Sequence, residues 1–131
     1  MTTIQVRTNK KNQMINVTSD IRKLVRESAI QEGIVVLFVP HTTAAITINE
    51  NADPTVKSDM LNGLETIIPN MKQFRHLEGN SDAHIKSSLV GVDQTILVHQ
   101  NELVLGMWQG IYFCEFDGPR TRNLVVEIIS N

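Results

Sequence analysis

The sequence predicts an α+β protein in which a mostly antiparallel sheet is folded on itself, as a sandwich or barrel-like structure, and carries two or three helices. Three observations support this prediction. The last third of the chain reads as strands separated by turn residues. Two earlier segments place apolar residues at helical spacing. Residues 107–116 have large apolar side chains on both faces of a strand pattern, so a sheet folded on itself or a neighbouring subunit must cover the second face.

Composition indicates one globular domain, residues 1–131. The 131 residues are 41% hydrophobic and 20% charged, and the net charge of −2 provides no basic surface for nucleic acid. The chain start lacks the apolar core of a signal peptide, and no run approaches the roughly 18 apolar residues of a membrane span. We therefore expect a cytoplasmic protein with no nucleic-acid or membrane partner. The single cysteine, Cys114, lies in an apolar strand pattern, which favours a buried, inert thiol over a nucleophile.

The first elements are two short strands and a helix. Residues 4–8 alternate like a half-exposed strand, and residues 14–17 can pair back with them as a hairpin at the edge of a sheet. Residues 18–20 are good N-caps for an amphipathic helix that Gly33 ends. The charged residues on the opposite face of this helix are interpreted as solvated surface, without a function.

Polar side chains then gather around a central strand. An apolar run, Ile34 to Val39, leads through His41 into a strand at Ala44 to Ile48, and amides and carboxylates follow from Asn49 to Asp53. The place where a strand gives way to a helix is a common position for a site. A structural role in turns or caps weighs at least equally for any one of these residues.

A second helix begins at Asp53 and Pro54, which match the N-cap and first-turn preferences. Its N-terminus offers free backbone donors to a phosphate or carboxylate, although Asp53 would compete for them. The helix ends at Pro69, and its apolar stripe consists of Val56, Met60, Leu64, Ile67 and Ile68.

The segment from Asn70 to Asp82 is a polar loop that contains titratable and metal-binding side chains, including His76 and Glu78. A short helix follows from about Ala83 to Val90, with Ile85 and Leu89 expected to face inward and His84 on another face. His99 lies beside a turn and is interpreted as an ordinary surface residue or a hydrogen-bonded core residue, without a role in a site. His41, His76 and His84 differ from it because each has polar, site-like neighbours.

The last third predicts an antiparallel meander of strands. Turn residues at 100–101 and 117–119 separate the strand patterns. These patterns cover residues 94–98, 103–105, 107–116 and 124–129.

Several of these segments resemble the signature blocks of the YjbQ-like family, in the order that family has them. The match covers nearly the whole chain, and one position departs from it, because the usual Gly-Thr-Trp-Gln reads Gly-Met-Trp-Gln here. The matching blocks are residues 38–45, 49–53, 76 with 78–80, 82–86, 106–109 and 116–120.

The resemblance implies a small α+β protein that forms homotrimers and has an enzyme-like pocket. Members of this family are often labelled secondary thiamine-phosphate synthases, which would join a thiazole phosphate to a pyrimidine pyrophosphate, and the physiological function of the family is not settled. We therefore expect an enzyme-like trimer that acts on a phosphorylated or anionic small molecule, with weak thiamine-phosphate synthase activity at most.

As an enzyme, the protein would use His41, Asp53, His76 and His84 as catalytic groups, and Glu50 and Asp82 could add carboxylates. The three histidines are also the expected ligands of a divalent metal, Zn²⁺ or Mg²⁺. The alternative is a non-enzymatic ligand-binding or assembly module, in which the same polar side chains are structural. The expected substrate-binding residues are Asn49, Glu50, Asn51, Asn80, Trp108, Gln109 and Arg120.

Overall fold

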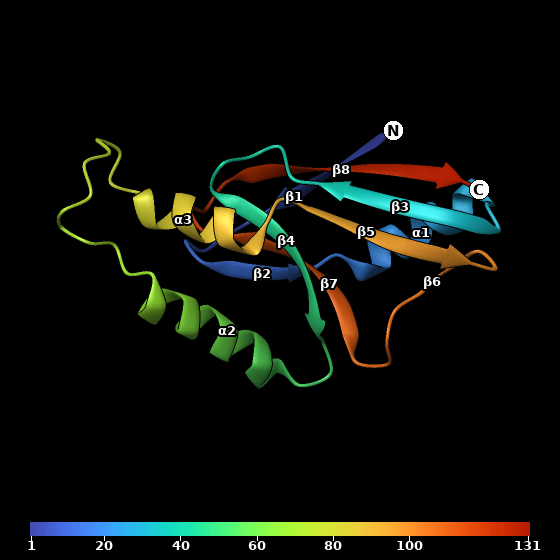
Figure 1. The fold of residues 1–131 in the computed structure, drawn as a ribbon, viewed down its shortest axis with the longest axis horizontal. Helices are drawn as coiled ribbons and strands as arrows, with labels where there is room; N and C mark the ends of the chain where they lie inside the picture. Colours follow the sequence, from blue (N-terminus) through green and yellow to red (C-terminus); the bar gives the residue numbers. More distant parts are fainter.

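The computed structural model describes all 131 residues and shows two antiparallel sheets that curl toward each other as a half-barrel, with three helices (Figure 1). The elements are β1 (Thr2–Arg7), β2 (Gln13–Asn16), α1 (Thr18–Ser28), β3 (Glu32–Phe38), β4 (Ala44–Glu50), α2 (Pro54–Ile67), α3 (Ser81–Val90), β5 (Asp93–His99), β6 (Glu102–Leu103), β7 (Gln109–Glu115) and β8 (Thr121–Ser130). The predicted α+β class, with a mostly antiparallel sheet folded on itself, is confirmed. No helix is long and apolar enough to span a membrane.

The strand order differs from the one that the sequence predicted. The larger sheet has the order β1-β8-β3-β5-β6, and the smaller one the order β2-β7-β4. The predicted hairpin of β1 with β2 is therefore wrong, because β1 pairs with β8 and β2 pairs with β7. The predicted meander is wrong as well, since the tight turn after β7 sends β8 into the other sheet.

Hydrogen bonds between two connections explain this exchange of partners. The Thr8 amide donates to the Arg120 carbonyl at 2.9 Å, and the Gly118 amide donates to the Lys11 carbonyl at 3.1 Å. The β1–β2 connection is thus held against the β7–β8 turn. The strand β1 therefore lies beside β8, and β2 lies beside β7. Both β1 and β2 are edge strands, but of different sheets.

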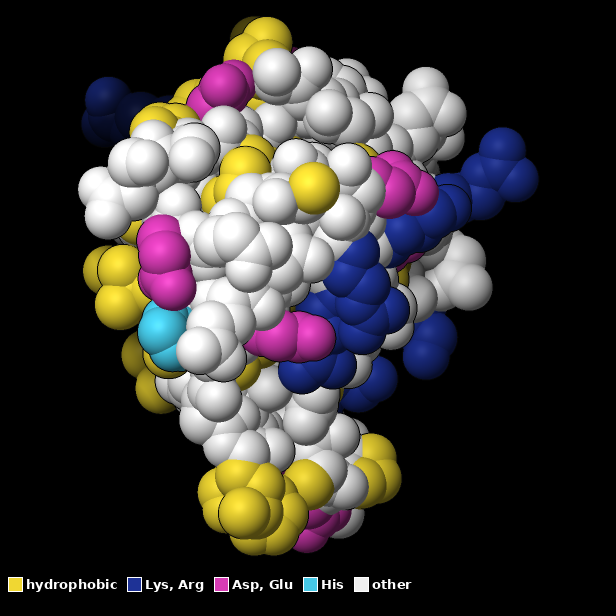
Figure 2. All heavy atoms as spheres, turned by 90° about the vertical axis from the view of Figure 1, so that its right-hand side faces the viewer, with side chains coloured by type: hydrophobic (Ala, Val, Ile, Leu, Met, Phe, Trp, Pro, Cys, Tyr) yellow, Lys and Arg dark blue, Asp and Glu magenta, His cyan; other side chains and the backbone are white.

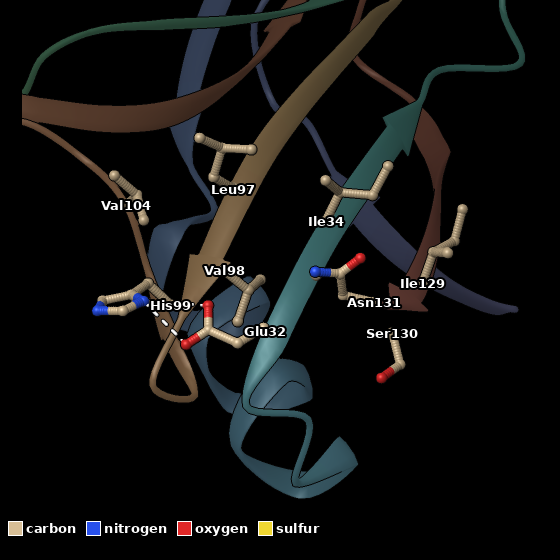
Figure 3. Close-up of a pocket in the computed structure, with 10 residues that line it drawn as sticks. Glu32, Ile34, Leu97, Val98, His99, Val104, Ile129, Ser130 and Asn131 are labelled. Carbon is tan, nitrogen blue, oxygen red and sulfur yellow. Dashed lines mark hydrogen bonds and ion pairs between the residues drawn. The ribbon is translucent and has the colours of Figure 1, made fainter.

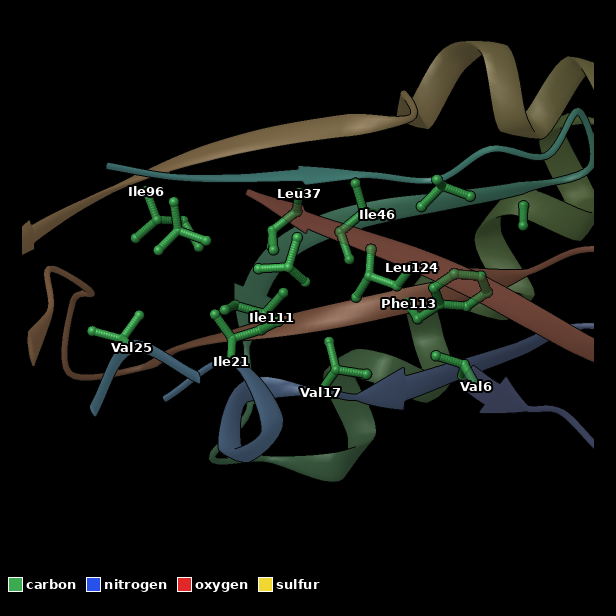
Figure 4. Packing of buried hydrophobic residues seen from close by; sticks show 14 of the residues in the cluster. Val6, Val17, Ile21, Val25, Leu37, Ile46, Ile96, Ile111, Phe113 and Leu124 are labelled. Carbon is green, nitrogen blue, oxygen red and sulfur yellow. The ribbon is translucent and has the colours of Figure 1, made fainter. Parts of the chain in front are cut away.

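The main core lies between the two sheets and is closed by α1 (Figure 4). On β7, Ile111 and Phe113 point into this core, while Tyr112 and Cys114 join a second apolar cluster on the other face. The prediction that this strand is covered on both sides is therefore correct, and Cys114 is buried as expected.

The end of α1 differs from the prediction. The helix ends at Ser28, and Ala29 adopts the left-handed conformation that terminates it. Gly33 lies within β3 instead, where a Cβ atom would collide with the backbone of Ile129 on β8. The glycine therefore permits close approach of two strands and does not end the helix.

The apolar stripe of α2 is predicted in the right place, but only Ile68, at the C-cap, is buried. Asp53 is the N-cap, as predicted, because its carboxylate accepts a hydrogen bond from the Thr55 amide at 2.9 Å. No residue of α2 is buried, and Ile67 is 76% exposed. The helix therefore lies loosely against the smaller sheet.

The orientation predicted for α3 is wrong. Ile85 and Leu89 are 37% and 70% exposed, while the buried face carries Asp82 and Lys86. These two residues form an ion pair one helical turn apart, with their charged groups 3.7 Å from each other. Apolar periodicity alone does not detect a helix face whose buried members are charged and paired.

Candidate functional site

The three histidines expected in a site come together at the end of the molecule that carries α3. His41 follows β3 and lines a surface pocket of about 580 Å³ with His84 of α3. The ring of His76 lies edge-on to the ring of His84, with 5.3 Å between their centroids. These two histidines also line an adjoining pocket of about 460 Å³. The fold thus gathers side chains that are far apart in the sequence.

His41 is held in the neutral state. Its Nε2 atom accepts a hydrogen bond from the Asn123 amide at 2.9 Å, which places the proton of the neutral ring on Nδ1. Burial lowers the pKa of His41, and the positive charge of Arg122 lowers it further. The imidazole is therefore uncharged at neutral pH, and with its acceptor nitrogen occupied by Asn123 it presents the Nδ1–H as a hydrogen-bond donor.

The geometry of a single chain does not by itself form a metal centre. No three His, Cys, Asp or Glu side chains lie close enough together to hold an ion. The Nε2 atom of His41 is already engaged by Asn123, which leaves His76 and His84 as a pair. The expected Zn²⁺ or Mg²⁺ site stays a prediction. A second chain or a rotation of His41 would have to supply the third ligand.

A buried ion pair lies next to His41. The guanidinium of Arg122 donates through Nε to the Oε1 atom of Glu115 at 2.8 Å and through Nη2 to the hydroxyl of Thr43 at 2.8 Å. Burial alone would raise the pKa of Glu115, but hydrogen bonds from Arg122, Asp117 and Thr8 outweigh it and lower that pKa. Sequence reasoning did not assign this pair, although a carboxylate at the end of an apolar strand was an available signal.

Asn80 and Arg120 both bind Asp117. The Asn80 amide donates to the Asp117 carboxylate at 2.7 Å, and Arg120 donates to the same oxygen at 3.1 Å. The side chain of Arg120 remains 47% exposed, so it can still meet a ligand. The second carboxylate oxygen of Asp82 and the amide oxygen of Asn80 are buried without a hydrogen-bond partner.

The other predicted site residues lie at the opposite end of β4. This strand has seven residues, so its ends are about 20 Å apart. At the far end the backbone amide of Asn51 donates to the Trp108 carbonyl at 2.9 Å. The side-chain oxygen of Gln109 accepts from the Gly106 backbone amide at 2.8 Å. The residues at this far end, where β4 meets α2 and β7 begins (Figure 1), are Asn49, Glu50, Asn51, Asp53, Trp108 and Gln109.

This far end, which we call the β4–β7 tip (residues 49–53 and 106–110), exposes apolar surface. Met107 is 85% exposed and Trp108 is 59% exposed. Figure 2 shows hydrophobic side chains gathered at the lowest point of the molecule, where the connection into β7 lies in Figure 1. The side chain of Asn51 is packed flat on Gly110, where an added Cβ would lie 2.8 Å from the Asn51 Cβ.

The largest hollow, about 620 Å³, lies on the outer face of the larger sheet, away from His41, His76 and His84 (Figure 3). Ile34 of β3 is paired with Leu97 on one side and with Ile129 on the other, so the three form a row across adjacent strands. His99 borders the row and lies 2.9 Å from the Glu32 carboxylate. Sequence reasoning gave neither His99 nor this outer row (Ile34, Leu97 and Ile129) a functional role.

Fold and site together define a small α+β half-barrel protein with a histidine-rich polar end. The sequence pattern described as "UPF0047 protein YjbQ-like" matches residues 2–131. The chain belongs to this family, whose members are uncharacterised proteins of unknown function.

Relatives from bacteria and archaea match over nearly the whole chain. The chain is 55% identical over 127 residues to a UPF0047 protein of Methanocaldococcus jannaschii. The alignment covers 97% of this chain and 92% of that protein. It is 48% identical over 128 residues to UPF0047 protein YugU of Bacillus subtilis, and the alignment covers 97% of each protein.

Solved structures have the same fold. A YjbQ/UPF0047 family protein of Clostridium acetobutylicum superposes with a TM-score of 0.96 at 49% identity and covers 98% of this chain and 100% of its own. A protein of unknown function from Sulfolobus solfataricus superposes with a TM-score of 0.95 at 31% identity, covering 99% and 96%. The predicted YjbQ-like fold is therefore confirmed.

Proposed function

We propose that the protein is a small enzyme that acts on a phosphorylated or anionic small molecule at the histidine end. The observation that carries this proposal is the convergence of His41, His76 and His84 on two adjoining pockets, with His41 held neutral. The Nδ1–H of His41 can donate a hydrogen bond to a substrate, and the imidazole of His76 or His84 can take a proton from a substrate and return one to a leaving group.

Groups that attract an anion lie nearby. The exposed guanidinium of Arg120 offers a charge-assisted hydrogen bond. The first turn of α3 has backbone N–H groups without helical acceptors, and His84 lies in the same turn. The buried carboxylate of Asp82 adds negative charge there, and Lys11 and Lys86 offset it at 3.1 Å and 3.7 Å.

Thiamine-phosphate synthesis would demand more positive charge than this end supplies. Displacing pyrophosphate from a pyrimidine methyl group needs cations around the leaving phosphates. The chain has no phosphate-binding loop, and Arg122 is committed to Glu115. We therefore propose that this activity is slow and that the physiological substrate is another phosphorylated or anionic small molecule. A Zn²⁺ or Mg²⁺ ion held by the histidines would supply the missing positive charge.

We also propose a homotrimer whose sites lie between subunits. Two observations support it: the outer row of the larger sheet is apolar and exposed, and so are Met107 and Trp108 at the β4–β7 tip. The tip and the histidine end lie about 20 Å apart in one chain. Contact between the tip of one subunit and the histidine end of the next would unite both groups of predicted residues.

A binding or assembly module is the second candidate, and specific contacts favour it. Asn80 and Arg120 already satisfy Asp117, and Asp53 caps α2. If these contacts exist only to stabilise the fold and its assembly, the histidines hold a ligand or an interface without turnover.

The experiment is an assay of thiamine-phosphate formation with the wild type and three variants, His76→Ala, His84→Ala and Arg120→Ala. We expect each variant to abolish turnover and to leave the assembly and the melting temperature nearly unchanged. Arg22→Ala is the matched control for Arg120→Ala, because it removes a positive charge at an exposed position of α1, outside both histidine pockets. Equal residual rates in all proteins would rule out this site. Variants that dissociate during size-exclusion chromatography would support the structural role.

A further inference from the structure

A further pocket, which is apolar, lies between α2 and the smaller sheet. Its volume is about 360 Å³, and it shares no residue with the pockets of His41, His76 and His84. We call it the α2 pocket. The sheet contributes Met14, Thr47 and Cys114, and the helix contributes Met60, Leu64 and Ile67.

The pocket exists because α2 stands off the sheet beneath it. The helix has no buried residue along its 14 positions, whereas α1, with 11, buries three. Val90 of α3 closes one side. The smaller sheet, α2 and the end of α3 thus enclose the pocket on three sides within a single chain, whereas an exposed sheet face would be open.

Gly63 keeps this space open. It lies inside α2, where glycine costs about 1 kcal/mol relative to alanine. A Cβ atom at Gly63 would meet nothing within 4 Å, so no close contact inside the chain requires the glycine. Gly33 and Gly110 differ, because a Cβ atom at either would collide with a neighbouring residue.

The lining selects the chemistry of an occupant. None of its eight residues is charged, and six of them are hydrophobic. Thr47 is half-buried and its hydroxyl makes no hydrogen bond within the chain, so the hydroxyl is free to bind a polar atom of a ligand. Burial raises the pKa of the Cys114 thiol to about 12, so the sulfur contributes no charge.

We propose that the α2 pocket binds a neutral, mostly apolar small molecule of about the size of one or two fused rings, with one polar atom at the Thr47 hydroxyl. The volume is near the lower end of the range of roughly 300–1,000 Å³ found for small-molecule sites. A charged ligand would lose its hydration without gaining a partner, since the pocket offers no opposite charge. The proposal does not depend on the enzymatic function proposed above.

The test uses 2-naphthol as a neutral probe and 2-naphthalenesulfonate as its charged analogue, with the methionine methyl groups observed by NMR. We expect 2-naphthol to shift the methyl signals of Met14 and Met60 in a saturable manner, and to leave that of Met107, at the β4–β7 tip, unchanged. The sulfonate should bind at least about tenfold more weakly.

Variants separate the pocket from general hydrophobic binding. Gly63→Leu should fill the space and weaken 2-naphthol about tenfold or more, whereas Gly63→Ala should change binding by less than about threefold. Thr47→Val should weaken it about fivefold to tenfold through the lost hydrogen bond. Asn62→Leu, which adds the same side chain at the exposed neighbouring position, is the control and should bind like the wild type.

Equal affinity in Gly63→Leu and the wild type, or equal affinity for the two probes, would overturn the proposal. Shifts of Met14 and Met60 that follow protein concentration and not the probe would also overturn it, because a second copy would then cover the pocket.

Discussion

Arg122 and Glu115 form an ion pair in the interior, with side chains only 3% and 0% exposed. The guanidinium reaches both carboxylate oxygens, through Nε to Oε1 at 2.8 Å and through Nη2 to Oε2. Thr8 donates to the same carboxylate at 2.8 Å. The pair joins β7 of the smaller sheet to β8 of the larger one, at the turn where the two sheets separate.

Loss of one member of this pair should be costly. We expect Glu115→Gln to reduce the free energy of unfolding by about 3–5 kcal/mol, because it leaves the charge of Arg122 buried without a counter-ion. Urea unfolding at pH 7 measures the loss. The double variant Glu115→Leu with Arg122→Leu should lose less than the single one, since both charges are removed. A single-variant loss below about 1 kcal/mol would contradict a buried, charged pair.

The same pair predicts a dependence of stability on pH. The pKa of Glu115 is lower in the folded state than its ordinary value of 4.5. Its stabilising contribution is therefore complete above pH 4.5 and is lost as the pH falls through the lower, folded value. We expect the wild type to lose stability more steeply below pH 4.5 than Glu115→Gln does. Parallel pH profiles of the two proteins would be incompatible with the lowered pKa.

His41 should titrate below the ordinary histidine value of 6.5, because burial and Arg122 both disfavour its charged form. In the unfolded chain His41 takes up its proton near pH 6.5, so the folded state loses stability relative to the unfolded state as the pH falls below that value. The Hε1 chemical shift followed by NMR gives the midpoint directly. A midpoint at or above 6.5 would refute the assignment of a neutral His41.

Two glycine substitutions should have opposite effects on stability. Gly110→Ala should cost about 1–3 kcal/mol, because its Cβ would displace the side chain of Asn51 from the β4–β7 tip. Gly63→Ala should stabilise the protein by up to about 1 kcal/mol, since it improves helix propensity in open space. Thermal unfolding of the pair measures the contrast. The same sign for both would show that contacts at these sites do not decide the outcome.

The outer row of the larger sheet should control assembly. We expect Ile34→Asp to convert the proposed trimer to monomers, because it places a charge between Leu97 and Ile129. Thr3→Asp, on the outer face of the edge strand β1, is the matched control and should remain trimeric. Sedimentation equilibrium at micromolar concentration distinguishes the two masses. A wild type that sediments as a monomer would remove the trimer and the shared site together.

Short-range chemistry made much of the fold predictable. Asp53 and Pro54 start α2 where the sequence places it, and the double-sided apolar pattern of residues 107–116 predicts a strand covered on both faces. The strand pairing was not predictable in this way, because β1 and β2 meet their partners more than 90 residues further along the chain. The orientation of α3 also failed, since Lys86 counts as a surface residue until Asp82 is placed beside it.

The sequence by itself determined the fold class and the family, because these depend on local patterns and ordered motifs, and it predicted a set of site residues. Only the tertiary structure decided which of those residues meet. It brings His41, His76 and His84 together and leaves Asn51, Trp108 and Gln109 at the other end of β4, about 20 Å away. The physical reason is that β4 is an extended strand. Residues just before it and just after it are close in the sequence, but the length of the strand holds them apart in space.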